Sequence, residues 1–175
     1  MTGTGILLCG LNGAGKSTLG RVLAEKLHFH FIDNEDLYFP KTDPMYPYAF
    51  SRSREEVERL LFQEIEIHKN FIFTSVTGNY GDAEKPFFQY VVWVEVPREL
   101  RLQRIRDRSF QKFGDRVLPG GALYEKENQF FEFAKARPED MVARWVQSLS
   151  CPVIRVDGTK PVEENAAFIA GQIRR

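Results

Sequence analysis

Cysteine is scarce in this chain of 175 residues, and neither sign of charge dominates it. The two cysteines, Cys9 and Cys151, are too few for a disulfide framework and indicate free thiols in a reducing compartment. Lys and Arg total 24 residues, and so do Asp and Glu. The balanced charge therefore does not favour nucleic acid or an anionic membrane as a partner.

Long apolar runs are lacking as well. None approaches the roughly 20 residues that a membrane-spanning helix needs, and the apolar stretch nearest the N-terminus does not fit a signal peptide. The sequence contains no repeat, low-complexity tract or linker that would divide it. We therefore expect a single domain over residues 1–175, cytoplasmic and monomeric, without a membrane or nucleic-acid partner.

The most informative stretch is residues 10–17, which reads GLNGAGKS. It fits the phosphate-binding pattern G-x-x-x-x-G-K-[ST] at every fixed position. The apolar run 5–9 before it is typical of a buried strand, and Leu19, Leu23 and Leu27 after it recur at helical spacing. Strand, glycine-rich loop and helix follow one another in the order that this motif requires.

The residue types of this loop suit the phosphates of a nucleoside triphosphate. Its glycines let the backbone curl and turn N–H groups towards the β-phosphate. The helix that begins near Lys16 adds the positive end of its dipole. We expect Lys16 to reach the β- and γ-phosphates and the Ser17 hydroxyl to ligate Mg²⁺.

Acidic residues follow the second predicted strand, residues 29–32. Asp33 and Asp36 come at the carboxyl end of that strand, where an open α/β sheet binds its ligands. Asp33 is a candidate for the Mg²⁺ shell, through water, and Asp36 for orienting or deprotonating an acceptor. The alternative is a helix N-cap followed by a solvated acidic turn, because Asp suits both roles.

Residues 38–50 contain three prolines among several tyrosines, which excludes a continuous helix. An ordered loop of this composition either shapes an acceptor pocket or forms a well-packed connection. Arg52 and Arg54 follow it, at the start of a helix with a capping-box pattern. They are either ligands for an anion or solvated surface charges.

Arginines gather in the helix predicted after Pro97. Such a charged helix face is usually solvated, but beside a triphosphate the planar forks of arginine bind phosphate oxygens. The strand-like run 71–76 ends without the aspartate of a Walker B motif. Asp33 is therefore the better candidate for a carboxylate near the metal.

Predicted strands and helices alternate along the whole chain. The strands are expected near residues 5–9, 29–32, 71–76, 90–96 and 152–156. This alternation favours an α/β fold, with a parallel sheet of five strands and helices on both faces.

The chain resembles the small P-loop kinases, the group that contains adenylate kinase and shikimate kinase. Residues 10–18 carry the most specific likeness. Residues 31–36 look like the acidic segment after the second strand of shikimate-type kinases. Residues 92–97, with Arg104 and Arg108, resemble the fourth strand and the arginine helix that leads into the lid of these kinases.

Two later stretches extend the resemblance. Residues 156–164 are similar to the adenine-contacting turn of nucleotide kinases, and residues 137–140 with Arg144 to the lid-return segment of adenylate kinases. The resemblance implies a three-layer P-loop NTPase fold with strand order 2-3-1-4-5 and a helical lid over about residues 109–137.

What the resemblance implies for function is transfer of the γ-phosphoryl group of ATP to a small acceptor, with Mg²⁺ as the metal. The expected metal ligands are Ser17 and Asp33. The residues expected to act in catalysis are Lys16, Asp36, Arg108, Arg137 and Arg144. The residues expected to bind the nucleotide are Leu11, Asn12, Gly13, Ala14, Gly15, Lys16, Ser17, Thr18, Arg104, Gly158, Thr159, Lys160 and Pro161.

The sequence thus predicts an ATP-dependent small-molecule kinase whose acceptor is open, because residues 37–53 match neither nucleotide kinases nor shikimate kinases. A nucleoside monophosphate is favoured, since Arg52 and Arg54 are available for a second phosphate. A hydroxyl-bearing metabolite is the close alternative. The rival hypothesis is a nucleotide-binding regulator that hydrolyses ATP slowly, which the missing Walker B aspartate favours and the arginine-rich lid opposes.

Overall fold

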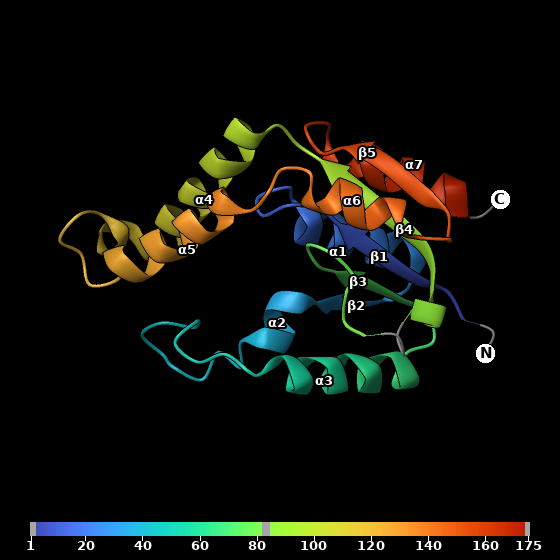
Figure 1. The fold of residues 1–175 in the computed structure, drawn as a ribbon, viewed down its shortest axis with the longest axis horizontal. Helices are drawn as coiled ribbons and strands as arrows, with labels where there is room; N and C mark the ends of the chain where they lie inside the picture. Colours follow the sequence, from blue (N-terminus) through green and yellow to red (C-terminus); the bar gives the residue numbers. More distant parts are fainter. Residues whose placement is uncertain (1–2, 82–84, 174–175) are drawn as a thin grey trace.

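The computed structural model describes residues 3–81 and 85–173. Within them, five parallel strands form one sheet in the order β2-β3-β1-β4-β5, which confirms the expected order. The strands are β1 (Gly5–Cys9), β2 (His30–Asp33), β3 (Phe71–Thr74), β4 (Phe88–Glu95) and β5 (Val153–Asp157). Helices cover both faces of the sheet (Figure 1).

Alternate residues of the central strand point into two separate cores. Ile6 and Leu8 of β1 pack against α1 (Lys16–Leu27) and α7 (Val162–Ile173). Leu7 faces the other way, into a core shared with α3 (Arg54–Ile67) and α6 (Met141–Gln147). Burial on both faces explains why β1 reads as a continuous apolar run instead of an alternating one.

Two further helices extend away from the sheet on the side of the phosphate loop (Figure 1). They are α4 (Arg98–Phe113) and α5 (Tyr124–Ala136), joined through the 3₁₀ turn η2 (Gly114–Val117). Ile105 of α4 packs with Phe131 and Ala134 of α5 in a small core of their own. The predicted lid, residues 109–137, corresponds to the end of α4, η2, α5 and the residue after it.

The proline-rich loop, residues 39–53, lies between the short helix α2 (Asn34–Tyr38) and α3. It forms neither helix nor strand, as its prolines predict. Tyr46 of this loop packs with Phe113 and Leu123 near the far end of the α4–α5 pair. Its hydroxyl donates a hydrogen bond of 2.6 Å to Glu127 Oε1 on α5, so the loop and the predicted lid touch directly.

The remaining element is a single 3₁₀ turn, η1 (Lys85–Phe87), which leads into β4. In the part of the chain that the structure describes, no helix is both long and apolar enough to cross a membrane.

Candidate active site

The loop between β1 and α1 has the backbone geometry that its glycines predict. Gly13 and Gly15 lie in the left-handed region, with φ of 83° and 88°. A Cβ on Gly13 would stand 2.3 Å from the carbonyl oxygen of Arg101, so only glycine fits there. Gly15 caps α1 without a side-chain hydrogen bond, which leaves N–H groups at the helix start for an anion.

Lys16 lies in the first turn of α1, partly buried, and its Nζ donates to the carbonyl oxygen of Leu11 at 3.3 Å. The pKa of Lys16 is lowered to about 8, chiefly by burial; the charges of Arg108 and Arg137 contribute to the lowering, and the Asp33 carboxylate opposes it. These electrostatic interactions bring together four residues that the sequence analysis selected from separate stretches of the chain.

Asp33 is the last residue of β2 and is buried. Its Oδ1 accepts hydrogen bonds from the Glu35 backbone N–H at 3.1 Å and from the Thr74 hydroxyl at 3.4 Å. Asp33 therefore does cap α2, which was the alternative for this residue, while its charge still acts on Lys16. With the Ser17 hydroxyl it offers oxygen donors of the type that Mg²⁺ prefers, few in number and completed by water.

Arg137 contributes a partly buried guanidinium that lacks a full set of hydrogen-bond partners. Its Nε is buried without a hydrogen bond, its Nη1 donates to the sulfur of Met141 at 3.6 Å, and the guanidinium lies over the ring of Phe133. Burial lowers the pKa of Arg137 as well. Because buried donors are normally satisfied, an unpaired guanidinium beside Lys16 fits an anionic ligand such as a phosphate.

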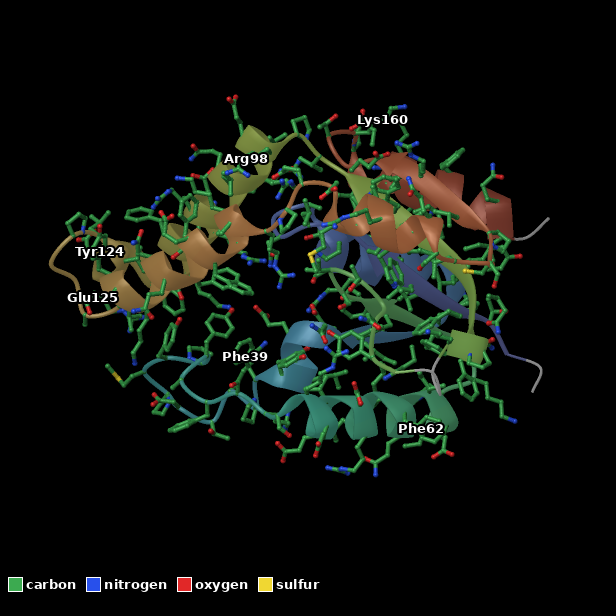
Figure 2. All side chains as sticks on the ribbon, viewed as in Figure 1. Phe39, Phe62, Arg98, Tyr124, Glu125 and Lys160 are labelled. Carbon is green, nitrogen blue, oxygen red and sulfur yellow. The ribbon has the colours of Figure 1, made fainter. Side chains whose placement is uncertain are left out.

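A cavity of about 320 Å³ opens between the phosphate loop and the turn after β5. Arg104 joins the two sides, since its Nη2 donates to the carbonyl oxygen of Gly158 at 3.1 Å. Asn165 Nδ2 holds the same turn through a 2.8 Å hydrogen bond to the Asp157 carbonyl oxygen. Figure 2 shows Lys160 in this turn. The lining residues are Gly13, Ala14, Gly15, Thr18, Leu19, Val94, Arg104, Ile105, Arg108, Gly158, Lys160, Val162 and Asn165.

Seven of the thirteen residues predicted to bind the nucleotide line this cavity, whereas Leu11, Asn12, Lys16 and Ser17, in the loop and at the start of α1, do not. Two members of the predicted turn, Thr159 and Pro161, are not part of its lining. The Thr159 hydroxyl instead donates to Asp157 Oδ1 at 2.6 Å and shapes the turn.

A second cavity, of about 220 Å³, lies between α2, the proline-rich loop and the α4–α5 pair. Aromatic side chains dominate it, and Phe39 stands beside α2 below the two helices (Figure 2). Arg108 and Ile105 line this cavity and the first one alike. Its lining residues are Glu35, Phe39, Tyr46, Tyr48, Ile105, Arg108, Ser109, Lys112, Phe113, Glu127 and Phe130.

The polar groups of the second cavity are mostly bonded to one another. Glu127 accepts hydrogen bonds from the Tyr46 hydroxyl and from Ser109 Oγ, the latter at 2.7 Å. Lys112 is hydrogen-bonded to the Tyr48 hydroxyl and lies over its ring. Arg108, by contrast, forms no hydrogen bond or ion pair with any described residue. Its guanidinium therefore lies between the two cavities without a hydrogen-bond or ion-pair partner among the described residues.

Asp36 and Arg144 are placed elsewhere. Asp36 Oδ1 pairs with Lys41 Nζ at 2.5 Å, and its side chain is 53% exposed. Arg144 Nε pairs with Asp140 at 3.2 Å, and its side chain is 64% exposed. Neither residue lines the two cavities, whereas Glu35, next to Asp36, does. A catalytic role for Asp36 or Arg144 therefore stays a prediction without support from these contacts.

Arg52 and Arg54 are structural in their contacts. Arg52 Nη1 donates to the carbonyl oxygens of Asp36 and Leu37, at the end of α2. Arg54 pairs with Glu58 at 3.0 Å and donates to the carbonyl oxygen of Asn79. Because both guanidinium groups are bonded to the protein and lie outside the cavity linings, the expectation that they hold a second phosphate is not supported.

Arg101 is the most buried charged residue that sequence reasoning missed, with 3% of its side chain exposed. Its Nη1 donates to the carbonyl oxygen of Asn12 in the phosphate loop at 3.2 Å, and its Nη2 contacts both Glu139 oxygens at 2.7 Å. The signal available in the sequence is the spacing of four from Ile105, which places both on the inner face of α4.

The lowered pKa of Lys16 predicts a pH effect on nucleotide binding. Below a pH of about 8 the ammonium group is charged, and above it the free protein loses that charge. Phosphates favour the charged form, so binding above this pH takes up a proton, and ATP affinity falls by at most about tenfold per pH unit. Calorimetric titration at pH 8.5 in two buffers of different ionisation enthalpy measures the uptake. Equal heats in both buffers would contradict it, and Lys16→Met, which has no proton to gain, is the control.

Comparisons with known proteins agree with this geometry. A family model described as AAA domain matches residues 6–117. The uncharacterized protein YqaC of Bacillus subtilis (strain 168) is 32% identical over 169 residues, and the match covers 91% of each chain. Shikimate kinase of Prochlorococcus marinus (strain MIT 9211) is 24% identical, with 93% of this chain and 92% of the relative covered.

Solved structures share the fold over nearly the whole chain. Shikimate kinase from Acinetobacter baumannii, solved in complex with shikimate, superimposes with a TM-score of 0.63 at 23% identity, covering 98% of this chain and 93% of that one. Deoxyadenosine kinase from M. mycoides gives a TM-score of 0.54 at 16% identity, covering 98% and 99%. At these identities the likeness shows a common fold alone.

Proposed function

Because the chain belongs to the AAA domain family and, within the P-loop proteins, to the small P-loop kinases, we propose that it transfers the γ-phosphoryl group of ATP to a hydroxyl group of a small molecule. The observation that carries the proposal is the position of Arg108. Its side chain lines both the cavity beside the phosphate loop and the aromatic cavity next to it. A phosphoryl group moving from one cavity to the other passes this guanidinium.

The chain's own cations are arranged for such a transfer. In this proposal Lys16 binds the β- and γ-phosphates, and Arg108 and Arg137, whose charges act on Lys16, bind oxygens of the transferring group. Arg137 gains in this way the partner that its buried Nε lacks. Ser17 and Asp33 would hold Mg²⁺, which supplies neutralising charge on the phosphates. Catalysis is then positioning combined with electrostatic stabilisation of the transition state.

The aromatic cavity supports a particular class of acceptor. Its aromatic side chains favour a flat ring by stacking. Glu35 and Glu127 already bind Lys41, Tyr46 and Ser109, but each carboxylate oxygen has a second lone pair that can accept a hydrogen bond from an amino or hydroxyl group. Lys112 is engaged by Tyr48, and Arg108 is shared with the nucleotide side, so no cation in the lining remains for a second phosphate. We therefore propose a nucleoside-like acceptor, a flat ring that carries a hydroxyl group, in preference to a nucleoside monophosphate.

Glu35 is the carboxylate best placed to meet the acceptor hydroxyl. It lines the aromatic cavity from the first turn of α2. Asp36, the residue predicted for this role, lies outside the lining and pairs with Lys41 at 2.5 Å, whereas the same ammonium group stands farther from Glu35, 3.4 Å from its Oε2. A carboxylate within reach of the hydroxyl orients it and takes its proton as the new O–P bond forms.

ADP release with Mg²⁺ and ATP, measured against a panel of acceptors, tests the proposal. The panel contains nucleosides, the corresponding monophosphates, shikimate and simple sugars, and Lys16→Ala supplies the background rate. We expect at least one nucleoside to raise ADP release well above hydrolysis, because its ring and its hydroxyl both match the cavity.

Two outcomes would count against it in different ways. Stimulation by monophosphates alone would leave the kinase but contradict the acceptor class. Tight ATP binding with no stimulation by any member of the panel would instead favour the nucleotide-binding regulator, the second candidate. The missing Walker B aspartate after β3 is the observation that favours this regulator.

A further inference from the structure

A second group of metal-binding side chains lies away from the phosphate loop. His30 is the first residue of β2, whereas the phosphate loop follows the last residue of β1. Because the strands are parallel, these two sites stand at opposite ends of the sheet. Glu64 in the last turn of α3 and His68, which caps that helix, face His30 across the edge of the sheet, where α3 runs beside β2 (Figure 1).

The donor atoms of the three side chains converge. Glu64 Oε2 lies 2.8 Å from His30 Nε2 and 3.8 Å from His68 Nε2, and all three donor atoms lie within 4.8 Å of one another. Around a tetrahedral zinc ion with bonds of about 2.0–2.1 Å, neighbouring donor atoms stand roughly 3.3 Å apart. The two distances to Glu64 bracket this value, so rotation of the side chains can bring the three atoms to one ion.

Both the sequence spacing and the strand position support the convergence. Glu64 and His68 are four residues apart and therefore share one face of the helix end, the spacing that helical metal motifs use. The backbone N–H of His30 donates to the Asn70 carbonyl oxygen at 3.0 Å, which fixes the strand beside the end of α3. Two of these three ligands thus come from one helix end and the third from the neighbouring strand.

The side chains are accessible and adjustable. His30, Glu64 and His68 are 36%, 37% and 38% exposed, so an ion and its water can reach them. The two imidazole rings stack with centroids 3.5 Å apart. Binding one ion requires the rings to turn away from this stack, which exposed side chains can do by rotating about χ1.

We propose that His30, Glu64 and His68 bind one divalent transition-metal ion, Zn²⁺ or an ion of similar chemistry, with water completing the coordination. Two imidazoles and one carboxylate suit such an ion, whereas Mg²⁺ prefers oxygen donors. The site is independent of the proposed kinase reaction. Its effect is to tie the end of α3 to the edge strand of the sheet and so to stabilise the folded chain.

Titration of the full chain with Co²⁺, without nucleotide, tests the site. We expect visible d–d absorption that saturates at one Co²⁺ per chain and disappears on addition of Zn²⁺, together with a higher Tm in Zn²⁺ than in EDTA. His68→Ala should weaken Co²⁺ binding at least about tenfold. Removing a residue that only supports a metal ligand already costs about this much, and removing a ligand should cost more. His28→Asn is the matched control, because it removes a histidine outside the cluster and Asn tolerates the left-handed backbone of that position.

The proposal is overturned if the wild-type chain shows neither the Co²⁺ absorption nor a Zn²⁺-dependent Tm. It is equally overturned if a His30→Ala/His68→Ala chain binds Co²⁺ as tightly as the wild type. Melting in EDTA first establishes that each variant is folded. Should His68→Ala fail to fold, Glu64→Gln, which keeps the shape of the side chain and removes its charge, decides in its place by the same tenfold criterion.

Discussion

Replacement of Arg108 by alanine is expected to lower kcat for acceptor phosphorylation by about 10²–10³-fold, the loss typical of removing one donor that binds transition-state charge. The reason is the position of the side chain on both cavities, combined with its lack of a partner among the described residues. KM for ATP should change far less, because Lys16 and the loop N–H groups remain. Steady-state kinetics with saturating ATP and the best acceptor of the panel measure the effect.

Arg106 provides the matched control for this experiment. It lies on the same helix, but its guanidinium stands over the ring of Phe131, 3.6 Å from the centroid, and it lines neither cavity. Arg106→Ala should retain kcat within a few-fold of the wild type. Equal losses in the Arg106 and Arg108 variants would show that α4 needs its positive charge in general, which would contradict a specific role for Arg108.

Glu139→Gln is expected to lower the free energy of unfolding by about 3 kcal/mol, the lower end of the range for breaking a buried ion pair because Glu139 itself is half-exposed. The change leaves the Arg101 guanidinium buried without a counter-ion, while that guanidinium still carries the hydrogen bond to Asn12. We expect ATP affinity to fall as well, because the same hydrogen bond holds the phosphate loop. Urea unfolding followed by circular dichroism measures the stability.

Arg98 supplies the comparison for this second prediction. It also contacts Glu139, at 3.0 Å, but its side chain is 41% exposed, so Arg98→Ala should cost less than about 1 kcal/mol. Adding Arg101→Met to Glu139→Gln should recover part of the lost stability, since the unpaired buried charge is then gone. If Glu139→Gln costs no more than Arg98→Ala, the buried pair does not support the loop.

The parts of the site that depend on local patterns could be predicted from the sequence. Gly10, Gly15 and Lys16 lie within one short continuous stretch of the sequence, so the phosphate loop is recognisable without tertiary information. Alternation of strands and helices indicated the parallel sheet, and the resemblance supplied its order. Asp33 could be selected as a candidate because it stands at the end of a predicted strand, and the carboxyl ends of parallel strands meet at one edge of the sheet. Its role at the metal stays a prediction.

The aromatic cavity is formed by contacts between segments that are distant in the sequence, so local sequence patterns did not predict all of its lining residues correctly. Arg52 looked free for a phosphate, but its guanidinium binds carbonyl oxygens at the end of α2. Glu35 and Asp36 are neighbours on a helix of five residues, too short for periodicity to show which one faces the cavity. Glu127 lies 81 residues from Tyr46, and no local pattern reveals that pair.

Arg101 shows a different limit. It was grouped with the other arginines of α4 as surface charge or phosphate ligands, whereas it is buried against Glu139 and the phosphate loop. Composition alone treats all these arginines alike, because their surroundings are set by which face of the helix meets the protein. The position four residues before Ile105 would have separated it from its neighbours.

Arg108 lines both cavities, so the two cavities adjoin, and this has a consequence for inhibitor design. A single molecule that joins adenosine to an acceptor-like ring through a phosphate chain would place its two ends in adjoining cavities. Each end would raise the effective concentration of the other, so affinity would rise well above that of either half without any new contact. The length of the phosphate chain in the compound that binds most tightly would then indicate the distance that the phosphoryl group travels between the two cavities.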